Sequence, residues 1–192
     1  MKILITGATG FIGSHIVKVF HRQHNVTALV RKTSSLDFIS RYKVNLLKGD
    51  LQDKEFVSLA VKGFDLIVHA AAKVQDWGCY QEFLEANVNA SLNLIESVDL
   101  GTRMVFISSI AVMGEEDCLQ AKDEIAPYNP VCPYFFESFL PSGMNHYRLS
   151  KTIAEQMLIR KAEIRGINIC VLRPVWVFGP REFHAGPYEY CK

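Results

Sequence analysis

Two residues one helical turn apart, Tyr147 and Lys151, have the types and the spacing for acid–base chemistry. Positions i and i+4 lie on the same face of a helix. A phenol with a pKa of about 10 is a poor proton carrier at neutral pH, but a neighbouring ammonium group stabilises the phenolate and lowers that pKa. Ser108 and Ser109 end an apolar run typical of a strand, where a hydroxyl could orient a carbonyl or alcohol. Alone, a Tyr–Lys pair is a common surface feature, so the surrounding elements must support this interpretation.

A glycine-rich loop follows the first apolar run of the chain and precedes a helical segment. Its glycines would allow a tight turn, close approach of the backbone to a pyrophosphate, and close packing of the helix on the strand. The helix N-terminus adds unpaired amides and a positive dipole end. The spacing is GxxGxxG rather than GxGxxG, and no GK[ST] follows as in a P-loop. In this position the loop favours dinucleotide binding over a purely structural turn, and its candidate contacts are Gly7, Thr9, Gly10, Phe11, Ile12 and Gly13.

Arg31 and Lys32 follow the second apolar run, where dinucleotide-binding folds distinguish NAD from NADP. An acidic residue there accepts the ribose 2′-hydroxyl of NAD, whereas a guanidinium can pair bidentately with the 2′-phosphate of NADP. The first acidic residue beyond this point is Asp37. The pattern therefore predicts NADP as the preferred cofactor, with NAD possible. The alternative is a pair of solvated basic residues at a strand end.

Short apolar runs alternate with longer helical segments, which predicts parallel strands with both sheet faces covered. The fold class expected is α/β, a Rossmann-type doubly wound parallel sheet. The expected strands are Lys2–Thr6, Val26–Val30, Val44–Lys48, Asp65–His69, Met104–Ser108 and Ile167–Leu172. The expected helices are Ile12–Phe20, Asp53–Val61, Tyr80–Val98 and Tyr147–Arg165.

Composition excludes several classes of protein. The 192 residues carry 21 Lys and Arg against 20 Asp and Glu, so no bulk charge favours nucleic acid or an anionic membrane surface. The five cysteines lack CxxC pairs, which argues against a zinc cluster or a disulfide scaffold and favours a reducing cytoplasm. We expect no metal site. No stretch is long enough to span a membrane, and the apolar run at the N-terminus is too short for a signal peptide.

Two segments fall outside the regular alternation. The stretch 115–146 carries four prolines and an aromatic group that would suit an apolar substrate or serve only for packing: Tyr134, Phe135, Phe136 and Phe139. After the last strand, no further helix or strand pattern follows. We therefore expect a nucleotide-binding domain over 1–182, with 183–192 as the start of a substrate-binding region or a truncated tail.

Several motifs in order along the chain resemble the extended short-chain dehydrogenases/reductases, which include NAD-dependent epimerases and dehydratases, 3β-hydroxysteroid dehydrogenases and dihydroflavonol-type reductases. Only the gap between Ser109 and Tyr147 departs from the pattern, because several relatives have a shorter one. The matching motifs are ITGATGFIG (5–13), GDL (49–51), HAAA (69–72), NVNASLNLIES (87–97), VFISSIAVMG (105–114), YRLSK (147–151) and RPVWVFGPRE (173–182).

The resemblance implies a role for each matching residue. It makes Ser109 the catalytic serine, Tyr147 the general acid/base, and Lys151 both a catalytic residue and a ligand of the nicotinamide ribose. It reads Asn87 as a structural tie around the site. The implied cofactor contacts are Asp50 and Leu51 at the adenine, Ala70, Ala71 and Ala72 along the cofactor, and Pro174 and Val175 beside the nicotinamide.

Three reactions share this chemistry. A dehydratase is disfavoured because Ile110 and Ala111 stand where the dehydratases carry an Asp–Glu pair. Between a carbonyl reductase and a nucleotide-sugar epimerase with bound NAD, Arg31 and Lys32 favour reduction with NADP. A third alternative is a non-catalytic NADP-binding module. The partners expected are a small-molecule carbonyl, alcohol or nucleotide-sugar substrate and, as a possible homodimer, a second copy of the chain. The part that selects the substrate would lie beyond this domain.

Overall fold

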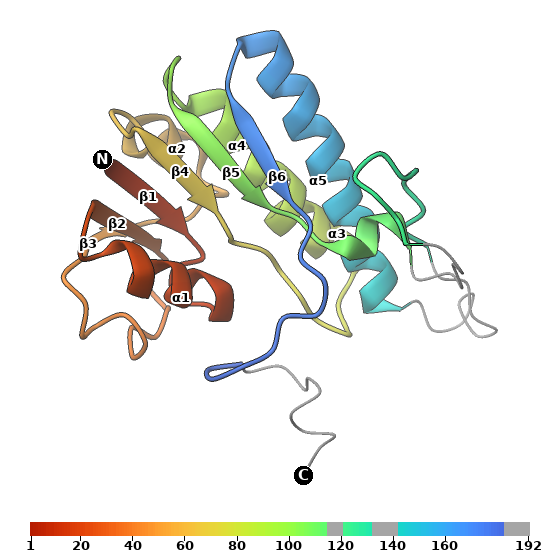
Figure 1. Cartoon of the computed structure of the whole chain (residues 1–192), viewed down its shortest axis with the longest axis horizontal. Coiled ribbons are helices and arrows are strands. Elements are labelled where there is room, and N and C mark those ends of the chain that lie inside the picture. The colour runs from red at the N-terminus through yellow and green to blue at the C-terminus, as the bar shows by residue number, and fades with distance from the viewer. Residues whose placement is uncertain (115–120, 132–141, 183–192) are drawn as a thin grey trace.

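The computed structural model describes residues 1–114, 121–131 and 142–182, and these form one parallel sheet with helices on both faces (Figure 1). The six strands lie in the order β3-β2-β1-β4-β5-β6, and every neighbouring pair is parallel. The order reverses between β1 and β4, which is where a doubly wound sheet binds ligands. The strands are β1 (Lys2–Thr6), β2 (Asn25–Val30), β3 (Asn45–Lys48), β4 (Leu66–His69), β5 (Arg103–Ile107) and β6 (Ile169–Leu172).

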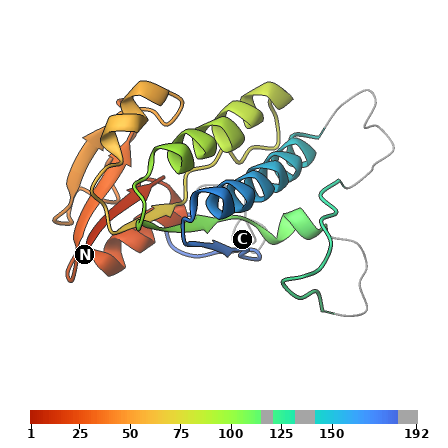
Figure 2. The same ribbon diagram turned by 90° about the horizontal axis from the view of Figure 1, so that it is seen from above.

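The helical elements follow the predicted alternation with strands. They are α1 (Phe11–Phe20), α2 (Lys54–Ala60), α3 (Tyr80–Phe83), η1 (Leu84–Asn89), α4 (Ala90–Ser97), η2 (Ile110–Met113) and α5 (Gly143–Arg165). Helices α2, α4 and α5 lie together on one face of the sheet, and α1 lies on the other (Figure 2). The predicted Rossmann-type α/β fold is therefore confirmed.

Two apolar clusters hold the layers together, one on each face of the sheet. The larger joins β4 and β5 to α4 and α5 through fully buried side chains such as Leu94, Phe106 and Leu158. The smaller packs Val17 of α1 against Ile5 and other residues of β1 and β2. Because apolar surface is removed from water on both sides, the central strands are fixed in place and their carboxyl ends share one edge.

The second face is only partly covered within the described residues. Near β6 the side chain of Leu172 is 48% exposed, and the chain that follows leaves Val175, Trp176 and Phe178 each about two-thirds exposed or more. The expectation that helices cover both faces therefore holds at β1 and β2 but not at β6. Among the described residues, no helix is both long and apolar enough to cross a membrane.

Three local features differ from the sequence-based expectation. The long helix α5 begins at Gly143, four residues before Tyr147, so Tyr147 lies inside the helix rather than at its start. The predicted helix from Tyr80 is interrupted by a π-helical turn, Leu84–Asn89. A short 3₁₀ helix, Ile110–Met113, follows β5. The aromatic group at 134–139 lies outside the described residues.

Candidate functional site

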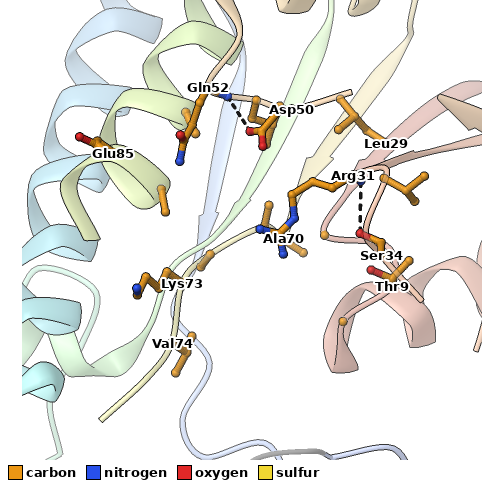
Figure 3. A pocket seen from close by; sticks show the side chains of 18 of the residues that line it. Thr9, Leu29, Arg31, Ser34, Asp50, Gln52, Ala70, Lys73, Val74 and Glu85 are labelled. Carbon is orange, nitrogen blue, oxygen red and sulfur yellow. Dashed lines mark hydrogen bonds between the residues drawn. The ribbon is translucent and has the colours of Figure 1, made fainter. Parts of the chain in front are cut away.

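A pocket of about 580 Å³ opens at the carboxyl ends of the strands, where the order of the sheet reverses (Figure 3). Its walls come from the glycine-rich loop, the ends of β2 and β4, the segment after β3 and the start of the helix after β4. The lining residues are Gly7, Thr9, Gly10, Leu29, Val30, Arg31, Ser34, Asp50, Leu51, Gln52, Ala70, Ala71, Ala72, Lys73, Val74, Gln75, Glu82, Glu85, Ala86 and Ala90.

The glycine-rich loop can form only with glycines at two positions. Gly7 has φ +67°, and a Cβ there would lie 2.6 Å from the Ala71 nitrogen. A Cβ on Gly13 would lie 2.0 Å from the Gly7 carbonyl oxygen. The turn is closed by the Gly10 amide, which donates to the Gly7 carbonyl at 3.0 Å. These close approaches leave an open cradle at the N-terminus of α1, which suits the phosphates of a dinucleotide.

The end of the pocket where we expect the adenosine to bind is lined by one basic and one acidic side chain, Arg31 and Asp50. Figure 3 shows the Arg31 side chain extending into the pocket toward Ala70, while its backbone amide donates to Ser34 Oγ at 3.2 Å. Asp50 faces the same space, and its carboxylate accepts from the Gln52 amide at 2.9 Å. Lys32 is exposed and is not among the lining residues. Of the two basic residues, the structure places only Arg31 in the pocket.

Small side chains form the floor of the pocket, as the sequence predicts. Ala70 and Ala71 follow β4, and both are anchored on Thr6 of β1. The Ala70 amide donates to the Thr6 carbonyl at 3.2 Å, and the Ala71 amide donates to the Thr6 hydroxyl at 3.3 Å. Side chains larger than alanine would fill the space that the glycine-rich loop leaves open. The described residues therefore fit a bound dinucleotide.

Tyr147 and Ser109 are brought together although they lie far apart in the sequence. Ser109 follows β5 and caps the 3₁₀ helix η2, where its hydroxyl accepts from the Ala111 amide at 3.2 Å. Burial raises the pKa of the Tyr147 phenol above its ordinary value, and hydrogen bonding with Ser109 works against that rise. The phenol is therefore protonated at neutral pH, and the Ser109 hydroxyl is within hydrogen-bonding reach of its oxygen.

Lys151 lies one turn further along α5, and its ammonium does not act on the phenol as predicted. Its Nζ donates to the Ile107 carbonyl at 2.6 Å and lies 4.1 Å from the centre of the Phe106 ring. Burial lowers the pKa of Lys151 to about 7, and the charge of Glu155 acts in the opposite direction. The expectation that Lys151 lowers the pKa of Tyr147 is therefore wrong for this structure, because burial raises that pKa and the hydrogen bond that opposes the rise comes from Ser109, not from Lys151.

Other predicted cofactor residues lie outside the pocket in the described structure. Phe11 and Ile12 line a separate apolar groove that α1 forms with residues 177–180. The Pro174 carbonyl accepts from the Ile110 amide at 3.0 Å, which ties the chain after β6 to the segment that follows Ser109. Val175 is 68% exposed. Gly13 packs against the phosphate loop without lining the pocket.

Asn87 ties together the chain around the site, as the sequence resemblance implies. Its amide oxygen accepts from the Lys73 backbone nitrogen at 2.6 Å, and its amide nitrogen donates to the Lys73 carbonyl at 3.1 Å. The same nitrogen donates to Ser150 Oγ at 2.9 Å, one residue before Lys151. The π-helical turn that contains Asn87 therefore connects the pocket wall at Lys73 to helix α5.

His69 lies at the buried end of β4 and has a fixed tautomer. Ser91 Oγ donates to the Asn87 carbonyl at 2.5 Å, so it must accept from Nε2 of His69 at 2.8 Å. The Thr6 hydroxyl then donates to Nδ1 at 2.7 Å. Burial lowers the pKa of His69 to about 3, with a smaller contribution from Lys151. The described residues contain no group of His, Cys, Asp and Glu side chains placed to hold a metal ion.

Sequence reasoning missed several residues at this site. The segment after β4 contributes three polar residues to the pocket, Lys73, Gln75 and Glu85. Their spacing in the sequence does not indicate this position, because the path of the segment depends on the π-helical turn. Glu155 was also missed. Its position one turn after Lys151 was the available signal, since residues four apart share a helix face.

The sheet order, the glycine cradle and the pocket at the switch point together define a Rossmann-type dinucleotide-binding domain. The model of the NAD dependent epimerase/dehydratase family matches residues 3–189, and the chain belongs to that family. This confirms the resemblance to extended short-chain dehydrogenases/reductases.

Curated relatives include both epimerases and oxidoreductases. Sterol demethylase protein B from Methylococcus capsulatus is 27% identical over 188 residues, covering 95% of this chain and 53% of that protein. Cinnamoyl-CoA reductase 1 from Arabidopsis thaliana is 31% identical, with 93% and 53% covered. UDP-glucose 4-epimerase from Vibrio cholerae is 29% identical, with 93% and 52% covered. The chain thus spans about half the length of these relatives.

Solved structures show the same arrangement. A UDP-galactose 4-epimerase has a TM-score of 0.81 and 26% identity, covering 100% of this chain and 61% of that one. The UDP-glucose 4-epimerase of Thermus thermophilus, solved in complex with NAD, has a TM-score of 0.77 and 29% identity, with 97% and 58% covered.

Proposed function

We propose that this protein is an NADP-dependent oxidoreductase that reduces a carbonyl group with Ser109, Tyr147 and Lys151 as its catalytic residues. One observation carries the proposal. Tyr147, on α5, is hydrogen-bonded with Ser109, which follows β5, and the same domain carries a pocket with the features of a dinucleotide site, although these two residues are not among those that line it. When bound there, the cofactor supplies a hydride to the carbonyl carbon.

Tyr147 acts as the proton donor in this proposal. Because burial raises the pKa of its phenol, the side chain enters the reaction protonated. Ser109 orients the carbonyl oxygen by hydrogen bonding, and the phenol gives its proton to that oxygen as negative charge develops on it. The Tyr147 oxygen then recovers a proton from water.

Lys151 provides a positive charge beneath this site. Lys151 is 2% exposed and its ammonium is held by the Ile107 carbonyl, so few water molecules can screen it. We also propose that Lys151 binds the nicotinamide ribose, as the family resemblance implies.

The cofactor proposal rests on Arg31. Its guanidinium extends into the pocket at the end of β2, where a 2′-phosphate would lie, and Asp50 is held by Gln52 on the neighbouring segment. Asp50 and Leu51 would meet the adenine. The second candidate, a nucleotide-sugar epimerase with bound NAD, is favoured by the similar epimerase that was solved with NAD.

We further propose that the substrate-binding part of the protein lies outside residues 1–182. The pocket described here has the features of the phosphate and adenosine parts of a cofactor site, and the chain after β6 leaves large apolar side chains exposed, Trp176 and Phe178 among them. The nature of the carbonyl substrate would then be set by residues that face this surface.

Replacing Tyr147 by Phe tests the function. In the complete protein, we expect Tyr147→Phe to lower kcat about 10²–10⁴-fold, which is the usual contribution of general acid catalysis. NADPH should still bind to the variant. The assay follows NADPH oxidation with a panel of ketones, aldehydes and nucleotide sugars. Tyr80→Phe, on the neighbouring helix α3, is the control. Turnover by the Tyr147 variant at the wild-type rate would refute the assignment, and sugar epimerisation without net oxidation of the cofactor would favour the second candidate.

A further inference from the structure

A carboxylate with no exposure to solvent lies behind the proposed catalytic residues. Glu155 is 0% exposed and sits on α5, one turn after Lys151 and two turns after Tyr147. Residues at this spacing share one helix face. Burying a carboxylate costs free energy unless donors and an opposite charge surround it, so its contacts show what keeps it there.

Four donor groups from three other segments converge on Glu155. Its Oε1 accepts from the Tyr128 hydroxyl at 2.8 Å and from Nε and Nη2 of Arg173 at 2.9 and 2.6 Å. Its Oε2 accepts from the Ser108 hydroxyl. Arg173 also lies over the Tyr128 ring, 5.2 Å from its centre. Both oxygens therefore accept hydrogen bonds, three at Oε1 and one at Oε2.

These donors belong to the segments that border the proposed site. Ser108 immediately precedes Ser109, and its backbone amide donates to the Leu172 carbonyl at 2.7 Å. Arg173 immediately precedes Pro174, whose carbonyl holds the Ile110 amide. Through Glu155, helix α5 is thus connected to the chain after β5, to the chain after β6 and to the segment 121–131 that contains Tyr128. A displaced Glu155 would move Ser109 relative to Tyr147.

Glu155 also contributes the negative charge that opposes the effect of burial on Lys151. From β5, Lys151 meets only the Ile107 carbonyl and the Phe106 ring, and from β4 it faces the neutral His69. Glu155 lies on the same helix as Lys151 and is paired with Arg173. Among the described residues, it is the acidic group whose charge acts on this ammonium.

We propose that Glu155 is a positioning residue for the proposed reaction: it fixes Ser109 relative to Tyr147 by linking α5 to the segments after β5 and β6, and it places a buried negative charge one helical turn from the Lys151 ammonium. This proposal rests on the function proposed above, because the groups that it positions are those of that reaction. No contact of Glu155 with substrate or cofactor is involved.

The test replaces Glu155 by Gln, which keeps the shape of the side chain and removes its charge. The Gln oxygen can still accept from Arg173 and Tyr128, while its amide donates to Ser108 Oγ. The titration of the Lys151 amine is followed by ¹⁵N NMR of the chain with labelled lysine. We expect its midpoint to fall by about one pH unit, the low end of the effect of a nearby opposite charge. Glu163→Gln, an exposed carboxylate on the same helix, is the control and should leave the midpoint unchanged.

A second variant keeps the proposal testable should Glu155→Gln fail to fold. Arg173→Met leaves the carboxylate without its counter-charge, so the Lys151 midpoint should rise. If the Lys151 midpoint stays at the wild-type value in the folded variants, the proposal is overturned. A lower melting temperature of these variants would not rescue it, because a purely structural role of Glu155 predicts lower stability with an unchanged midpoint.

Turnover gives the second readout. In the protein as the cell makes it, Glu155→Gln should lower kcat by up to about 100-fold, as misplacement of reacting groups does, with little change in the KM for NADPH. An unchanged kcat would also overturn the positioning role. The NMR titration needs no activity, so it stands even if Tyr147→Phe shows that the proposed function is wrong.

Discussion

The most direct test of cofactor choice is to remove the guanidinium of Arg31. It is the basic side chain that lines the pocket at the end of β2, whereas its neighbour Lys32 is exposed and lies outside. Arg31→Ala should weaken NADPH binding and leave NADH binding nearly unchanged. Arg31→Asp should weaken it further, because a carboxylate would repel the 2′-phosphate. Lys32→Ala is the matched control, one residue away and with the same charge.

The size of the effect follows from the contact proposed. A hydrogen bond to a charged group contributes about 1.5–3 kcal/mol, and a bidentate pair could contribute twice that amount. Arg31 is exposed, so solvent screens the pair, and we expect about 1 kcal/mol, the upper end for an exposed ion pair. That corresponds to roughly a 5-fold loss of NADPH affinity. The Asp variant should bind NADH more tightly than NADPH.

Fluorescence titration of both cofactors with the wild-type and variant chains measures this preference. It needs no substrate, so it can be done on residues 1–192 directly. Equal affinity of the wild-type chain for NADPH and NADH would refute the reasoning. An effect of Lys32→Ala as large as that of Arg31→Ala would show that general positive charge, rather than a placed guanidinium, attracts the phosphate.

Two further predictions concern the phosphate loop and the buried histidine. Gly13→Ala should abolish cofactor binding in the same titration, because its Cβ would lie 2.0 Å from the Gly7 carbonyl oxygen. Gly63→Ala is the control: its φ of +73° strains the backbone, but no atom lies within 4 Å of the new Cβ, so the folded variant should retain binding. The folded state lowers the pKa of His69 to about 3, so unfolding is favoured as the pH falls from about 6.5 toward 3, by up to about 1.4 kcal/mol per unit. Urea unfolding at several pH values measures this slope, which should be flatter for His69→Gln; equal slopes would contradict the assignment.

Much of the fold could be predicted from the sequence because its signals are local. The apolar runs of β1 and β4 are short and bounded by polar or glycine residues, and the structure places both strands within a residue of the predicted bounds. The glycine spacing after β1 likewise predicts the loop that lines the pocket. In each case the physical cause, burial on both faces or a backbone that excludes a Cβ, acts within a few residues.

The parts that were missed depend on contacts between distant segments. The pKa of Tyr147 cannot be read from its spacing to Lys151, because burial outweighs any effect of the lysine, whose ammonium is bound to the Ile107 carbonyl. Similarly, Arg31 and Lys32 are equivalent in the sequence, and only the turn after β2 decides which one faces the pocket. The connections made by Glu155 join four segments, and no local pattern reports them.

The π-helical turn Leu84–Asn89 restricts how this region can change in length. A π-helical turn closes over one residue more than an α-helical turn, so deleting one residue there would let a continuous α-helix form. Because the wide turn takes up the extra residue, the flanking helices would stay nearly in register, but the residues inside the turn would move to α-helical positions and lose the wider geometry that now places them. Asn87 could not then reach Lys73 and Ser150 while Leu94 stayed in the core. Single-residue insertions and deletions should therefore be harmful in this turn, even where substitutions of its exposed side chains are tolerated.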